Sequence, residues 1–166
     1  MEFFQRVFGV LSFRSSVYRS IAGDEKLNIE SSVIVIIISL LNSFLYTWIN
    51  GFSFQSVLRF LSPLLSWLFF GWFCAWIAEK FFKVKIPTAN MLRVLAHTRI
   101  FSIFGIIALN FYMSSSFILF PAVWIGIIAD IFGVRQTSDL SNGQAIIIYL
   151  LGILITTLPF RFVFGT

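Results

Sequence analysis

Five apolar stretches alternate with short polar connections along this chain. They cover residues 32–49, 57–78, 95–112, 117–134 and 144–164. Each stretch is close to the length of about 20 residues that an α-helix needs to cross the hydrocarbon core of a bilayer. The pattern therefore predicts an all-α polytopic membrane protein whose five transmembrane helices occupy residues 32–166. Within this region, Asn42 and Asn110 are polar positions that we expect to form hydrogen bonds between helices.

The first 31 residues have a different pattern, in which apolar positions recur at helical spacing. These positions are Phe4, Val7, Phe8 and Leu11. An unbroken helix would bring Arg14 onto the same apolar face, so we expect a break near residues 13–16 and a second short helix over 17–22. The pattern predicts an amphipathic helix over residues 2–12 that lies in the membrane interface, with its aromatic side chains in the acyl region. Packing of this segment against the helical bundle is the alternative.

Cationic side chains gather in alternate connections between the apolar stretches. The longest interior polar passage covers residues 79–99 and holds a single acid, Glu79. Its basic residues are Lys80, Lys83, Lys85, Arg93 and Arg99. The chain has twelve Lys and Arg residues. If the amino terminus is cytoplasmic, only Arg59 and Arg161 among them fall on the outer side. Since basic connections stay in the cytoplasm, this distribution predicts an N-in, C-out topology, with residues 1–31 as a cytoplasmic segment and connector.

The composition excludes an ordinary soluble domain. Hydrophobic residues make up 58% of the chain and charged residues 11%, whereas a soluble domain has about 25% charged residues. The net charge is +5. Because the basic residues are confined to a few connections, we expect them to orient the protein and to contact anionic lipid rather than nucleic acid.

Basic residues on the expected cytoplasmic side are candidate contacts for lipid headgroups or for a partner protein. They are Arg6, Arg14, Lys80, Lys83, Lys85 and Arg93. Lys and Arg side chains near an anionic membrane surface contribute about 1 kcal/mol each to the attraction. We therefore expect these residues to form the binding surface of the protein.

An acidic residue near the end of the fourth apolar stretch is the main polar feature at membrane depth. A carboxylate at the position of Asp130 is costly unless it is paired or hydrated. Arg99 and Arg135 are the candidate partners, and all three would lie near the cytoplasmic boundary. An ion pair that fixes how the last three helices meet is one interpretation, and a transport path is the other.

Residues typical of catalysis are scarce in this sequence. It contains one histidine, His97, and one cysteine, Cys74. Glycine-rich phosphate loops and the GxSxG, HExxH and CxxC motifs do not occur. A lone histidine near the start of a helix favours a structural role, and a lone cysteine in an apolar run favours packing. We therefore expect no enzymatic activity, no cofactor and no metal site.

Three passages resemble the YIP family, the Ypt/Rab-interacting proteins, and in particular its bacterial and archaeal members. They are QRVFGVLSFRSSVYRSI at 5–21, MLRVLAHTRIFSI at 91–103 and WIGIIADIFGVRQTSDLSNGQA at 124–145. The last passage carries Trp124, the pair Arg135-Gln136, Asp139 and Ala145. The resemblance implies a five-span protein of the prokaryotic cytoplasmic membrane with a cytoplasmic amino terminus. The eukaryotic members act in vesicle traffic and membrane shaping, but their long polar amino-terminal region is missing here, so GTPase recognition is not implied.

Three functional hypotheses follow from these patterns. The first is a membrane scaffold that binds lipid, a second copy of itself or another membrane protein through its basic cytoplasmic face. The second is a small transporter or channel with Asp130 and Arg99 in its path. The third is a subunit of a larger membrane complex.

Overall fold

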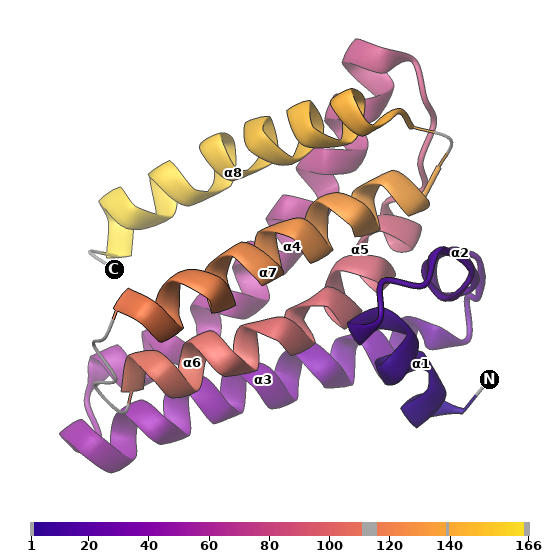
Figure 1. The fold of residues 1–166 in the computed structure, drawn as a ribbon. Helices are drawn as coiled ribbons and strands as arrows, with labels where there is room; N and C mark the ends of the chain where they lie inside the picture. The colour runs from indigo at the N-terminus through magenta and orange to yellow at the C-terminus, as the bar shows by residue number, and fades with distance from the viewer. Residues whose placement is uncertain (1, 111–115, 139, 165–166) are drawn as a thin grey trace.

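The computed structural model describes residues 2–110, 116–138 and 140–164, with side chains described for 2–107, 121, 123–138 and 140–156. Every regular element in these residues is helical, which confirms the prediction of an all-α protein. The helices are α1 (Phe3–Leu11), α2 (Ser15–Gly23), α3 (Leu27–Asn50), α4 (Phe54–Phe82), α5 (Thr88–Thr98), the 3-10 turn η1 (Arg99–Phe101), α6 (Ser102–Asn110), α7 (Ser116–Gln136) and α8 (Asn142–Phe164). Figure 1 shows the long helices lying along one another, with α1 and α2 at one end.

Among the described residues, α3 and α4 are long and apolar enough to cross a membrane. Their lengths are 24 and 29 residues, and their mean hydropathies are 2.0 and 1.6. Only 28% of the apolar stretch of α3 and 33% of that of α4 is buried. Most residues in these two apolar stretches are therefore at least partly exposed. The threading of five helices through a membrane, and its orientation, stay predictions.

The third predicted stretch belongs to a longer helical passage. α5 begins at Thr88, seven residues before the predicted start at residue 95, and the passage continues through η1 into α6. The 3-10 turn tightens the backbone at Arg99, where the polar side of α5 gives way to the apolar α6. α6 packs against α7, which runs back beside it in Figure 1.

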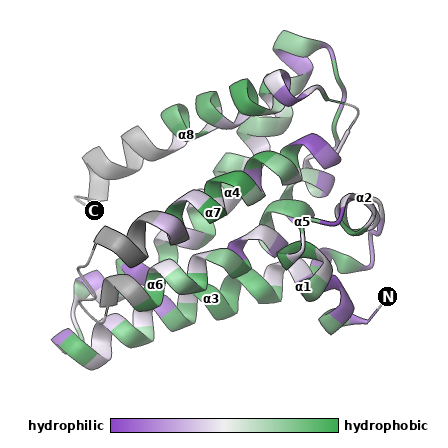
Figure 2. Ribbon diagram, in the orientation of Figure 1, coloured by the Kyte–Doolittle hydropathy of each residue, from purple (hydrophilic) through white to green (hydrophobic). Residues whose placement is uncertain are grey.

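Polar residues concentrate at one end of the bundle, which we call the polar end. It holds α1, α2, the α4–α5 connection and the α7–α8 connection (Figure 1). Figure 2 shows hydrophilic residues gathered at this end and hydrophobic residues along the long helices. The described part of α8 runs from the polar end to the opposite end of the bundle.

The first two helices form a hairpin that packs against the bundle. Phe13 has a φ of 52°, a left-handed conformation that turns the chain sharply between α1 and α2 and confirms the predicted break. A Cβ atom at Gly9 would lie 2.5 Å from Cγ2 of Val17, so only glycine allows the two helices to approach this closely. Val10 and Tyr18 are fully buried, and the Tyr18 hydroxyl donates to the Val10 carbonyl at 3.1 Å. The inner side of the hairpin therefore packs against the bundle, which was the alternative to contact with the membrane interface.

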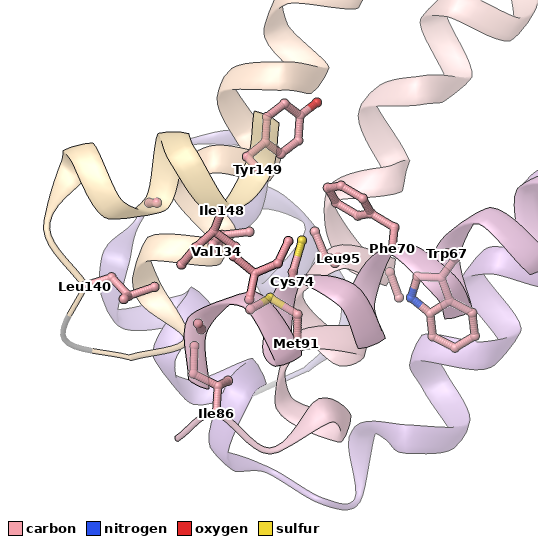
Figure 3. Packing of buried hydrophobic residues seen from close by; sticks show 14 of the residues in the cluster. Trp67, Phe70, Cys74, Ile86, Met91, Leu95, Val134, Leu140, Ile148 and Tyr149 are labelled. Atoms are coloured by element: carbon pink, nitrogen blue, oxygen red, sulfur yellow. The ribbon is translucent and has the colours of Figure 1, made fainter. Parts of the chain in front are cut away.

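The main hydrophobic core lies between α4, α5, α7 and α8 (Figure 3). Its fully buried members include Cys74, Met91, Val134 and Ile148. A Cβ atom at Gly152 would lie only 2.9 Å from the Cys74 sulfur, so α8 packs closely against α4 at this point. The cysteine is therefore a packing residue, as its apolar setting indicates.

A proline inside α4 is compensated by a side chain of α3. Pro63 has no backbone N–H, so the carbonyl of Arg59 loses the hydrogen bond that a regular helix would give it. The Asn42 side chain donates to this carbonyl at 3.1 Å. The prediction that Asn42 joins two helices is confirmed, whereas the side chain of Asn110 lies outside the described residues.

Candidate functional site

A shared carboxylate fastens the amino-terminal hairpin to the bundle. Glu30 lies in the first turn of α3, where the positive end of the helix dipole favours an acid. Its carboxylate accepts hydrogen bonds from both Nε and Nη2 of Arg6 in α1, the first at 2.9 Å. The same carboxylate lies 3.0 Å from Nε2 of His97 in α5. We call Arg6, Glu30, Arg93 and His97 the anchor, because they join α1, α2, α3 and α5.

The His97 ring lies fully buried between two polar neighbours. Its Nδ1 atom lies 2.8 Å from the Arg93 carbonyl, and its Nε2 atom faces Glu30. Because Glu30 also accepts from Arg6, the ring links α5 to the carboxylate that holds α1. The arrangement fits the structural role expected for this lone histidine.

Arg93 is the second half of the anchor. Its guanidinium donates to the carbonyls of Ile21 and Ala22 at 3.2 and 2.5 Å, and to the side chains of Asn28 and Asn90 at 2.8 and 2.6 Å. The last carbonyls of a helix have no partner within the helix, and a cation there also complements the helix dipole. Arg93 therefore caps the carboxyl-terminal end of α2 from inside the protein.

Two of the expected lipid contacts are thus engaged within the protein. Arg93 is only 2% exposed, so its side chain is not available to lipid, which corrects its expected role. Arg6 is 11% exposed at its side chain and is bound to Glu30, so its charge is directed inward as well. The sequence could not show this, because both arginines look like their exposed basic neighbours until the partner helix is placed. The polar residues Asn28 and Glu30 in the first turn of an otherwise apolar helix were the available signal.

The other basic candidates remain on the surface of the polar end. Arg14, Lys80, Lys83 and Lys85 are exposed. Lys80 and Lys83 line a recess of about 350 Å³ together with Trp76 and Glu79. Lys83 ends α4 in a left-handed conformation, with a φ of 59°. Lys80 and Lys83 thus lie next to the Trp76 ring. A basic side chain beside a tryptophan is typical of the boundary between acyl chains and headgroups.

Arg99 and Asp130 meet in a cleft between α4, η1, α7 and α8. Two recesses, of about 270 and 140 Å³, share Arg99, Asp130 and Tyr149 as lining residues. The Thr98 hydroxyl donates to the Asp130 carboxylate at 2.5 Å. The Nε atom of Arg99 is buried and has no hydrogen-bond partner among the described residues. We call this region the Arg99–Asp130 cleft.

The direct ion pair expected between Arg99 and Asp130 is not formed. Among the described side chains, no basic nitrogen lies within 4.0 Å of the Asp130 carboxylate, although Arg99 lines the same two recesses. Arg135 does not join them, because five residues of helix separate it from Asp130 and turn it to another side of α7. It is exposed and lines a different recess with Phe132 and Asn142.

Comparison with known proteins gives no family assignment. A scan against protein-family models, a search of curated proteins and a search of solved structures each find no match for this chain. The resemblance to the YIP family therefore rests on three sequence passages alone, and the case for function rests on the geometry described above.

Proposed function

We propose that this protein is an integral membrane scaffold of the YIP type, with five spans and a cytoplasmic polar end that binds lipid headgroups. The observation that carries this proposal is the exposure of large apolar side chains along the long helices. On α3 they include Ile36, Ile37, Leu40, Phe44 and Trp48, and on α8 Ile146, Ile147, Leu150 and Leu154. Contiguous apolar surface of this extent is unfavourable in water, whereas hydrocarbon chains cover it at no cost.

The arrangement of the ends supports the N-in, C-out topology. The chain reverses direction between α3 and α4, between α4 and the α5–α6 passage, between α6 and α7, and between α7 and α8 (Figure 1). Lys80, Lys83 and Lys85 lie at the polar end, together with the amino-terminal hairpin. A basic end of this kind stays on the cytoplasmic side.

The hairpin supports a role at the membrane surface. α1 exposes Phe4 by 71% and Phe8 by 68%, while Val10 on its inner side is fully buried. The anchor holds α1 by Arg6, so the two exposed rings keep a fixed position relative to α3. Aromatic side chains inserted at one leaflet act as a wedge that favours curvature, and this is the shaping activity that we propose.

Site-directed labelling tests the proposed topology. The native Cys74 is buried, so a cysteine placed at an exposed position reports its own side of the membrane. We expect Lys83→Cys to react with a membrane-impermeant maleimide only in inside-out vesicles. Gln55→Cys, at the opposite end of the bundle, should react only in intact cells. Reaction of both positions from the same side would rule out the topology.

Fluorescence quenching tests the lipid contact. Trp76 lies in the recess with Lys80 and Lys83, so in a variant that keeps Trp76 as its single tryptophan the emission reports lipid next to these cations. We expect brominated phosphatidylglycerol to quench tryptophan emission more strongly than brominated phosphatidylcholine. Replacement of Lys80, Lys83 and Lys85 by Gln should remove this difference, whereas Arg59→Gln, which changes a cation near the start of α4 and outside the recess, should leave it intact. Equal quenching by the two lipids in the unchanged protein would contradict a binding role for the basic end.

A further inference from the structure

We propose that the Arg99–Asp130 cleft is a binding site for one zwitterionic glycerophospholipid such as phosphatidylethanolamine. The proposal rests on the membrane location proposed above and adds a specific lipid site between helices to the general contact at the polar end. The argument has three parts: the shape of the cleft, its charges and its direction in the bundle.

The larger recess is polar at one end and apolar at the other. Its polar lining residues are Thr98, Arg99, Ser102, Asp130 and Tyr149. Its apolar lining residues are Gly105, Ile106, Val123, Gly126 and Ile127, from α6 and α7. A Cβ atom at Gly105 or Gly126 would have no neighbour within 4 Å, so the two glycines leave the groove between these helices open. A cleft of this form fits an amphiphile, with its headgroup beside the charged residues and an acyl chain along the groove.

The charges match a headgroup that carries one anion and one cation. The buried Nε of Arg99 is a donor without a hydrogen-bond partner among the described residues, and an orphaned donor is a strong reason to bind an acceptor. A phosphodiester supplies such an acceptor. Asp130 accepts from Thr98 and retains further lone pairs, which an ammonium group would satisfy. The cleft thus places one basic and one acidic side chain within reach of a zwitterionic headgroup.

The direction of the cleft agrees with the proposed membrane placement. Val123 precedes Asp130 by seven residues of α7, which corresponds to about 10 Å along the helix. α7 runs toward the polar end, so its apolar lining residues lie deeper in the bundle than Asp130 (Figure 1). A bound lipid would therefore place its headgroup toward the polar end and its chain toward the middle of the bilayer, as lipids of that leaflet do.

Lipid retention by the purified chain tests the site. The protein is reconstituted in vesicles with equal parts of phosphatidylethanolamine and phosphatidylglycerol and extracted in mild detergent, and the bound lipid is quantified by mass spectrometry. We expect Arg99→Gln and Gly126→Leu each to lower the retained phosphatidylethanolamine by about tenfold, because one removes the charged donor and the other fills the groove. The matched controls Arg135→Gln and Gly143→Leu, which lie outside the cleft, should retain as much as the unchanged chain. Equal retention by all five proteins would overturn the proposal.

A second measurement separates a lipid from a free anion. We expect short-chain phosphatidylethanolamine to raise the melting temperature of the unchanged chain, and phosphoethanolamine and inorganic phosphate to have no effect. An equal rise in melting temperature with phosphoethanolamine would overturn the lipid assignment. Flux of a small solute through lipid-free protein, dependent on Arg99 and Asp130, would overturn it as well. Resistance of the protein to alkaline carbonate extraction tests membrane integration separately. Failure of the lipid site is thereby distinguished from failure of the proposed function.

Discussion

Loss of the Arg93 guanidinium should release the amino-terminal hairpin while the bundle stays folded. In Arg93→Gln, the carbonyls of Ile21 and Ala22 lose the donor that caps α2, and Asn28 and Asn90 lose their shared partner. Gln is shorter than Arg and has two donors instead of five, so it cannot replace all four hydrogen bonds.

The magnitude follows from the number and burial of these contacts. Removal of one partner from a buried charged network costs about 3–5 kcal/mol, and each hydrogen bond to a charged group contributes about 1.5–3 kcal/mol. Because the carbonyls at the end of α2 gain access to water once the hairpin opens, we expect a value near the lower limit, about 3 kcal/mol. A change of this size raises the population of the open hairpin by about 100-fold.

Hydrogen exchange measured by mass spectrometry is the assay, with the protein in nanodiscs. We expect amides of α1 and α2 to exchange about 100-fold faster in Arg93→Gln, and amides in the middle of α4 to be unchanged. Arg14→Gln is the matched control, since Arg14 is exposed and its side chain does not cap α2. Equal exchange of the hairpin in the two variants would show that Arg93 does not hold it. Faster exchange throughout α4 would show instead that the hairpin and the bundle unfold as one unit.

Three further predictions concern other contacts. Asn42→Ala should destabilise the protein by about 1 kcal/mol, because the Arg59 carbonyl loses its donor. In a Pro63→Ala background the Arg59 carbonyl regains its helical partner, so the loss should be smaller. A double-mutant cycle measured by unfolding in detergent should therefore give a positive coupling energy. Glu30→Gln should increase proteolysis within residues 12–26, because Arg6 loses the carboxylate that fastens α1 to α3. Unchanged proteolysis would argue against Glu30 as the residue that fastens the hairpin. Gly9→Leu should separate α1 from α2 and increase exchange in α1 alone, and protection equal to that of the unchanged chain would contradict the close approach.

The apolar pattern predicted most of the helices, because a long run of apolar residues leaves few alternatives to a helix. The break at Phe13 was also predictable, since Arg14 has no place on the apolar side of a continued helix. The predicted span missed the start of α5 at Thr88, because residues 88–94 mix polar side chains with apolar ones. Met91 packs into the main core and Val94 packs against the hairpin. The length and periodicity of the apolar stretches therefore predicted which segments form helices better than they predicted the residues at which the helices begin and end.

The candidate sites were harder to predict, because a charged residue does not reveal its partner. Arg93 and Lys85 look alike in sequence, yet one caps a helix in the interior and the other is exposed. Asp130 and Arg99 line the same cleft, but the carboxylate accepts a hydrogen bond from Thr98, a residue that the sequence did not single out. Contacts of this kind depend on how helices pack, and a single sequence does not contain that information in readable form.

The anchor imposes an order on biosynthesis. Arg93 and Ala22 are 71 positions apart, and His97 and Glu30 are 67 positions apart. The hairpin leaves the ribosome long before its partners in α5 exist, so it cannot dock until α3 and α4 have been synthesised and the chain has returned to the polar end. During that interval the carboxyl-terminal end of α2 is uncapped and the buried face of Tyr18 is open to solvent. A nascent chain stalled before residue 93 should therefore carry a hairpin that is accessible to chaperones and proteases, and that becomes protected only when α5 emerges.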